Sequence, residues 1–193
     1  PEQLDLLVEH LPEGPHKICI CVMRYSASRI SETLKLKWSD ISNDSLLFKS
    51  INTKTDESRS IYLNDKLKLI LNEWKLIWHK YPLKARKVST QNKLIEYVIP
   101  QPQPEDYVFK GRKKGTHLNR KSVDRVVRRT LKELSIKGAS LHSTRRTCLT
   151  TLKNKGWQDA DIMAVSGHKD FSSLKKYLHT TPKQMKDMAY DFD

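Results

Sequence analysis

The chain has 193 residues, of which 37% are hydrophobic, and this suits one well-packed domain or at most two small ones. The 36 lysine and arginine residues outnumber the 22 aspartate and glutamate residues, and the resulting net charge of +14 favours a polyanionic partner. No apolar run approaches the roughly 20 residues that span a bilayer, which argues against a membrane-spanning protein.

The cysteines and the N-terminus set further limits. Cys19, Cys21 and Cys148 are odd in number and form no Cys-x-x-Cys pair, so neither a disulfide framework nor a zinc site is expected. Reduced, buried thiols in a cytoplasmic protein explain them better, and we expect no metal and no cofactor. The first residues are acidic and amphipathic rather than signal-like, and Pro1 stands where methionine begins a full chain. We therefore expect a fragment or a processed chain that lacks upstream domains.

The first half of the chain reads as helices interrupted by a hairpin. Apolar periodicity predicts helices over residues 2–11, from Gly14 onward through the apolar run 18–23, and through 28–41. Two strand-like runs, 45–51 and 59–63, flank a polar turn and predict a β-hairpin. Asn64 is placed to cap the next helix. The buried stripe expected for that helix is Leu67, Ile70, Leu71, Trp74, Ile77 and Trp78.

The second half begins with an irregular stretch over 82–106, whose closely spaced prolines predict a surface loop, and continues with a short strand at 107–109. Helices are then predicted from Asn119 to about Ser135, from Ser140 to Gly156, before Gly167, over 172–179, and from Pro182 to the end. The apolar edge of the last helix consists of Met185, Met188, Ala189 and Phe192. The predicted fold class is mainly α with a small antiparallel β-sheet (α+β).

Basic residues cluster in two segments, 110–115 and 119–129, which hold nine lysines and arginines between them. This clustering favours nucleic acid as the partner, although a charge run is often no more than a solvated face. A ribosome-like or simply soluble basic protein is the alternative. The candidate DNA-binding residues are Arg112, Lys113, Lys114, Arg120, Lys121, Arg125, Arg128 and Arg129.

A second set of residues carries possible chemistry. His142 and Arg145 are three residues apart and share one face of a predicted helix, and Tyr177 follows His168 by nine residues. Taken singly, each has an ordinary explanation: Tyr177 packs in a core, His168 follows a helix-capping glycine, and Arg29 pairs with Glu32 on the surface. Several such coincidences in one order are less probable than a shared site.

The ordered set resembles the tyrosine recombinase (phage integrase) family of site-specific DNA recombinases. That family carries an arginine, a lysine on a β-hairpin, His-x-x-Arg, Gly-His, and a tyrosine nine residues further on. The matching positions here are Arg29, Lys54, His142, Arg145, His168 and Tyr177. The text around the first arginine, "SRISETLKLKWSDI", also matches, and the resemblance covers nearly the whole chain. Lys49 lies close enough to compete with Lys54 for the lysine position.

The sequence departs from the family pattern at several neighbouring positions. The usual Gly-Leu before the first arginine is Ala27-Ser28, and the usual leucine before Gly-His is Ser166. Thr144 and Arg146 stand where leucine and histidine usually flank the second arginine. None of these changes removes a candidate catalytic side chain, and together they indicate a divergent member.

The resemblance implies cleavage and rejoining of DNA through a covalent 3′-phosphotyrosine on Tyr177, without metal or ATP. Arginine forks suit the non-bridging phosphate oxygens, so Arg29 and Arg145 are expected to clamp them. His142 is expected to act as acid or base near the tyrosine, and His168 to donate a hydrogen bond to the phosphate. Lys54 is expected to protonate the leaving 5′ oxygen.

The same resemblance sets the expected domains and partners. Residues 1–181 would form the catalytic domain, 182–193 a tail helix that docks onto a neighbouring protomer or packs in cis, and an N-terminal DNA-binding domain would be absent. Double-stranded DNA, self-association into a tetramer on DNA, and a cytoplasmic, nucleoid-associated location follow. Two alternatives remain open, which are a catalytically inactive DNA-binding relative and a type IB topoisomerase-like enzyme that relaxes DNA.

Overall fold

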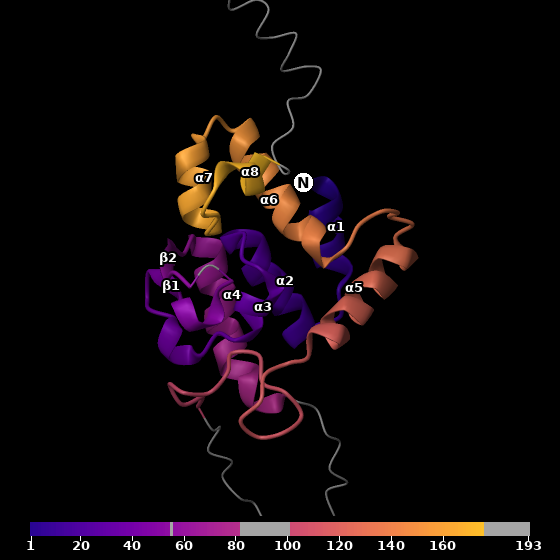
Figure 1. Cartoon of the computed structure of the whole chain (residues 1–193). Coiled ribbons are helices and arrows are strands. Elements are labelled where there is room, and N and C mark those ends of the chain that lie inside the picture. Colours follow the sequence, from indigo (N-terminus) through magenta and orange to yellow (C-terminus); the bar gives the residue numbers. More distant parts are fainter. Residues whose placement is uncertain (55, 82–100, 176–193) are drawn as a thin grey trace, which may run out of the picture.

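The computed structural model of the chain describes residues 1–54, 56–81 and 101–175, and within them the fold is mainly helical with a two-stranded antiparallel sheet (Figure 1). This agrees with the predicted fold class. The predicted tail helix, Tyr177 and most of the predicted surface loop lie outside the described residues.

The elements follow the predicted order closely. The helices are α1 (Glu2–His10), α2 (Pro15–Ser26), α3 (Ile30–Leu34), α4 (Asp65–Ile77), α5 (Arg120–Glu133), α6 (Leu141–Asn154), α7 (Asp159–Ser166) and α8 (Phe171–Lys175). Strands β1 (Ser45–Phe48) and β2 (Arg59–Tyr62) pair in antiparallel register, with Leu46 opposite Ile61, which confirms the hairpin. Short 3₁₀ turns are η1 (Trp38–Asp40), η2 (Ser50–Asn52) and η3 (Trp78–Lys80).

Helix α2 lies at the centre of the main core. It contacts α1, α3, α4 and α6, and its residues from Cys19 to Met23 are all buried. A helix enclosed on all sides needs no polar face, which is why the apolar run 18–23 lacks a one-sided period. The buried, reduced state expected for Cys19 and Cys21 is also what the structure shows.

A second, smaller core joins the last helices to the first arginine region. Ala27, Leu149, Ile162 and Leu174 pack together, so the turn after α2 is held against α6, α7 and α8. Figure 1 shows these three helices stacked on one end of the layer formed by α2, α3, α4 and the hairpin. The turn after α2, the start of α6 and the end of α7 therefore meet at the boundary between the two cores.

Two local predictions were wrong, and one tertiary contact explains both. The helix expected through 28–41 ends at Leu34, and the strand expected at 107–109 does not form. The backbone around Leu36 instead pairs with this segment, because Val108 N donates to Leu36 O at 2.9 Å and Lys37 forms an isolated bridge with Tyr107. A single bridge is too short to make a strand, and it draws residues 35–38 out of the helix.

The buried stripe of α4 was predicted correctly at four of its six positions. Asn64 caps the helix by accepting from Leu67 N at 2.8 Å. Leu67, Leu71, Trp74 and Trp78 are buried, whereas Ile70 is half-buried and Ile77 is 37% exposed. The helix tightens into η3 at its end, so Trp78 turns inward and donates from its indole to Tyr107 O at 3.0 Å, which leaves Ile77 outside.

Candidate active site

Arg29 stands at the start of α3, with its backbone held in the orientation of a helix cap. Glu32 accepts from the backbone N of Arg29 with Oε2 and from Nη1 of Arg29 with Oε1, both at 2.9 Å. The side chain of Arg29 keeps 23% of its surface exposed, whereas that of Glu32 has none. The carboxylate thus fixes the guanidinium from the protein side and leaves part of it accessible to a ligand.

Glu32 also binds a second arginine, which comes from the hairpin. Arg59 Nη2 donates to Glu32 Oε2 at 2.6 Å, Arg59 Nε donates to Val165 O at 3.0 Å, and the guanidinium stacks over the Phe48 ring at 4.5 Å. Burial opposes ionisation of Glu32, but hydrogen bonds and charge from Arg59, with those from Arg29, outweigh it and lower its pKa. One buried carboxylate therefore joins α3 to β2, and Arg59 extends the connection to the end of α7.

Arg145 is the most deeply buried of the candidate site residues. It is 1% exposed, and its guanidinium donates from Nη1 to Ala27 O at 2.6 Å and from Nη2 to Ser166 O at 2.7 Å. The same Nη2 lies 3.3 Å from His168 Nε2. The two backbone carbonyls are neutral, so these contacts orient the fork without adding a counter-charge.

His168 follows the left-handed turn that ends α7. Gly167 adopts φ +66°, and a Cβ there would lie 3.0 Å from Arg59 Nη1, so both backbone and packing favour glycine. The His168 ring is buried, with Nδ1 2.7 Å from Ser166 Oγ. Burial, with the charges of Arg145 and Arg29, lowers its pKa to about 4, which keeps the ring neutral at physiological pH.

His142 occupies the first turn of α6 and is exposed. Its pKa is lowered by partial burial and then by the charges of Arg145, Arg29, Arg146 and Arg120. His142 and Arg145 are three residues apart on α6 and so share one face of that helix, and Arg29 acts electrostatically on both His142 and His168. The structure therefore brings together Arg29, His142, Arg145 and His168, which come from three separate parts of the sequence.

Lys54 lies on the hairpin connection between η2 and β2 and is exposed. Its competitor Lys49 forms an ion pair with the buried Asp40, at 2.6 Å from Nζ to Oδ1. Lys49 is thereby tied to the base of the hairpin, and Lys54 is the better placed of the two to reach a ligand. Tyr177, the sixth candidate residue, lies outside the described residues.

All eight candidate DNA-binding residues are exposed, on the 110–115 loop and on α5. Helix α5 buries Val123, Val127 and Leu131 on its other face. Arg128 pairs with Asp124 at 2.6 Å and Arg129 with Glu133 at 2.9 Å, so part of the positive charge toward the end of the helix is balanced locally. Arg120 begins the helix and acts electrostatically on His142, which connects the basic surface to the candidate site.

Comparison with known proteins identifies the family. The sequence profile of the phage integrase family matches residues 1–184. The chain belongs to the phage integrase family.

Individual relatives agree with this assignment. A protein of Methanocaldococcus jannaschii named "Probable integrase/recombinase protein" is 26% identical over 93% of this chain, and the chain spans about half, 52%, of that protein. The XerH site-specific recombinase bound to its difH substrate shares the fold, with a TM-score of 0.68 at 19% identity over 100% of this chain and 53% of its own. The catalytic domain of bacteriophage HP1 integrase matches with a TM-score of 0.60 at 15% identity over 98% of this chain and 90% of that domain.

Arg59 and Ser166 contribute to the site although the sequence reading gave them no functional part. A signal for Arg59 was present, because Arg59, Ile61 and Leu63 alternate along one strand face whose apolar members are buried. An arginine on such a face needs a buried anion, and Glu32 supplies it. For Ser166 the signal was the departure from the usual leucine beside Gly-His.

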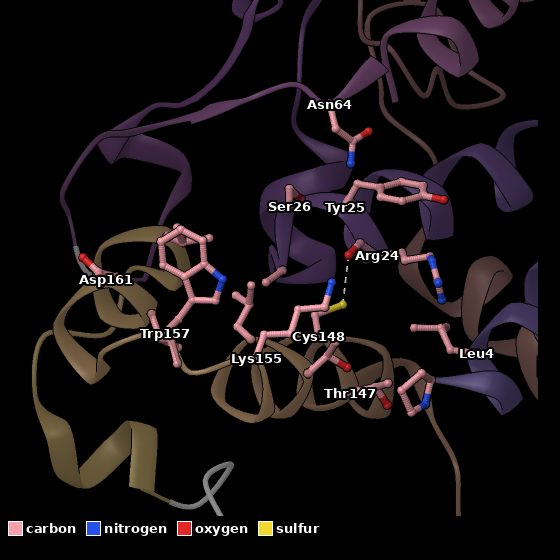
Figure 2. A pocket seen from close by; sticks show the side chains of 16 residues that line it. Leu4, Arg24, Tyr25, Ser26, Asn64, Thr147, Cys148, Lys155, Trp157 and Asp161 are labelled. Atoms are coloured by element: carbon pink, nitrogen blue, oxygen red, sulfur yellow. Dashed lines mark hydrogen bonds between the residues drawn. The ribbon is translucent and has the colours of Figure 1, made fainter. Parts of the chain in front are cut away.

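A pocket of about 420 Å³ opens on the opposite flank of α6, between that helix, the end of α2 and α7. Figure 2 shows Trp157 and Lys155 at its side, with Cys148 donating from Sγ to Arg24 O at 3.0 Å. Trp157 is 54% exposed. None of the residues that line this pocket belongs to the candidate active site.

Two negative findings apply to the described part of the chain. Within it, no group of three or more His, Cys, Asp or Glu side chains is arranged to hold a metal ion. Among its helices, none has the length and apolar character needed to cross a bilayer.

Proposed function

We propose that this chain is the catalytic portion of a site-specific DNA recombinase that cleaves and rejoins DNA through a covalent 3′-phosphotyrosine on Tyr177. The observation that carries the proposal is the meeting of two oriented guanidinium groups, Arg29 and Arg145, with the imidazoles of His142 and His168. Such a group matches the charge and the hydrogen-bonding needs of a phosphodiester during in-line attack.

In the proposed reaction Tyr177 Oη attacks phosphorus, and the bond from phosphorus to the 5′ oxygen breaks. Arg29 and Arg145 neutralise the charge that develops on the non-bridging oxygens. His142 has a lowered pKa and is therefore available as a neutral base for the phenol proton. Lys54 donates a proton to the leaving 5′ oxygen. Reversal by another strand's 5′ hydroxyl reseals the DNA, so the step needs neither ATP nor a metal.

We propose that double-stranded DNA binds along the loop 110–115 and the exposed face of α5. These segments carry nine exposed cationic side chains, the eight candidates and Lys132, and Arg120 acts electrostatically on His142. Phosphate contacts of this kind set position and orientation rather than sequence preference. The DNA-bound complex of the XerH recombinase is consistent with this use of the fold.

The domain proposal assigns residues 1–181 to catalysis and 182–193 to docking onto a neighbouring protomer. The tail sequence has an apolar edge of Met185, Met188, Ala189 and Phe192. The pocket beside Trp157 has a volume of about 420 Å³, and the apolar residues Leu152, Ile162 and Val165 line part of it. Docking in trans would support a tetramer on DNA, whereas packing in cis would leave the chain monomeric.

The test is covalent trapping in EDTA. A pool of nicked duplexes with randomised sequence is incubated with the wild-type chain, with Tyr177→Phe, and with Tyr62→Phe as the matched control, since Tyr62 is 85% exposed on β2. We expect a slow-migrating protein–DNA adduct on a denaturing gel with the wild type and Tyr62→Phe only. Adduct formation by Tyr177→Phe would overturn the assignment of the nucleophile. DNA binding by the wild type without any adduct would favour the inactive DNA-binding alternative.

A further inference from the structure

Ser166 is the last residue of α7 and touches both partners of the Arg145–His168 pair. Its backbone carbonyl accepts from Arg145 Nη2 at 2.7 Å, and its hydroxyl lies 2.7 Å from His168 Nδ1 and 3.3 Å from Met163 O. The residue is fully buried. We propose that Ser166 is a positioning residue whose hydroxyl pairs with His168 Nδ1 and thereby stabilises the proton arrangement of the ring.

The contacts that the ring makes with Arg145 and Ser166 favour one proton arrangement. A guanidinium can only donate, so His168 Nε2 accepts from Arg145 Nη2 across the 3.3 Å contact. The neutral ring then carries its proton on Nδ1 and donates it to Ser166 Oγ. Ser166 Oγ in turn donates to Met163 O. The chain of donors runs in one direction, from Arg145 through His168 and Ser166 to the α7 backbone.

The charges around His168 favour this neutral form. Arg145, Arg29 and Arg59 act against protonation, and Asp170 acts for it but is outweighed by burial and the arginines, which agrees with a pKa of about 4. Proton position in this ring is therefore a choice between two neutral tautomers rather than a gain of charge. The hydroxyl of Ser166 is the neighbour that can serve either tautomer, because it both donates and accepts.

This property matters if the proposed function holds, on which the catalytic part of the inference rests. A phosphate oxygen could accept hydrogen bonds from the Arg145 guanidinium. His168 could donate to the same oxygen if the ring carried its proton on Nε2. Rotation of the Ser166 hydroxyl toward Nδ1 stabilises that tautomer. The proton lost from Nδ1 and the proton gained at Nε2 exchange through water, so the ring stays neutral. Alanine or leucine at position 166 has no hydroxyl and could form a side-chain hydrogen bond with neither tautomer of His168.

The first test is nitrogen NMR of the His168 ring in the free protein at neutral pH, which does not depend on catalysis. We expect a protonated, pyrrole-like Nδ1 and an unprotonated Nε2 in the wild type, a shift of both signals toward a mixture of tautomers in Ser166→Ala, and recovery in Ser166→Thr, which keeps the hydroxyl. Ser122→Ala is the matched control, because it removes a hydroxyl from another Ser–His pair, with His16, at 3.3 Å. A proton on Nε2 in the wild type, or Ser166→Ala signals identical to wild type, would overturn the proposal.

The second test measures the rate of adduct formation under single-turnover conditions. Loss of one hydrogen bond to the ring is expected to slow Ser166→Ala about fivefold to tenfold, with DNA binding unchanged and Ser166→Thr restored. An unchanged rate in Ser166→Ala, with tautomers altered as expected, would overturn the catalytic part alone. Absence of adduct in every variant including wild type would instead count against the proposed function and leave the NMR result to decide on Ser166.

Discussion

Replacing Glu32 by glutamine removes the carboxylate that joins Arg29 to Arg59. Glutamine has the same shape, but it can place its oxygen at only one of the two carboxylate positions. If the amide oxygen stays where Oε2 accepts from Arg29 N and Arg59 Nη2, the amide NH₂ faces the Arg29 Nη1 donor, at 2.9 Å in the wild type. One charge-assisted hydrogen bond is lost and two guanidinium groups lose their counter-charge.

The expected cost is about 3 kcal/mol of unfolding free energy, because a hydrogen bond to a charged group contributes roughly 1.5–3 kcal/mol and breaking a buried ion pair costs about 3–5 kcal/mol. Asp44→Asn is the control. It breaks the exposed Lys68–Asp44 pair at 2.7 Å, for which about 0–1 kcal/mol is expected. Urea unfolding followed by circular dichroism measures both. A loss in Glu32→Gln no larger than in the control would refute this reasoning.

The pH dependence has a definite sign. The pKa of Glu32 is lowered on folding from its ordinary value of 4.5, so its stabilisation is present above that value and is lost as pH falls through the lower folded pKa. The difference in stability between wild type and Glu32→Gln should therefore be constant from pH 7 to about pH 5 and shrink at lower pH. A difference that grew on acidification would contradict the assigned charge state.

Three further outcomes are expected. In urea unfolding, Gly167→Ala should lose roughly 1 kcal/mol more stability than Gly156→Ala. Both glycines have positive φ, but only a Cβ at Gly167 meets Arg59. Equal losses would show that the Arg59 side chain moves aside at no cost. Arg120→Ala should reduce the slope of log affinity for DNA against log salt concentration by about one. Arg129→Ala should reduce it by less, because Glu133 already pairs with Arg129. Fluorescence anisotropy at several salt concentrations measures both slopes, and the reverse order would refute the proposed DNA path. Trp157→Ser and deletion of residues 182–193 should each weaken self-association on DNA, measured by light scattering. Assembly that persists in both variants would refute docking of the tail onto a neighbouring protomer at this pocket.

Local signals in the sequence were sufficient for most of the secondary structure. The cap at Asn64, the glycine after α7 and the period of α4 depend on residues within a few positions of each other, and these predictions were confirmed. The helix predicted through 28–41 ends early because the backbone around Leu36 pairs with Tyr107 and Val108, some seventy positions away, and no local pattern records that pairing.

The sequence by itself indicated the family and supplied the candidate site residues, because six residues of four types in a particular order and spacing are visible without coordinates. Only the tertiary structure decided how those residues are held. Arg145 reaches Ala27 O across 118 positions of sequence, Arg59 reaches Glu32 across 27, and His168 contacts both Arg145 and Ser166. Hydrogen-bond direction and burial depend on which groups meet in space, and for segments so far apart that is a property of the packed fold.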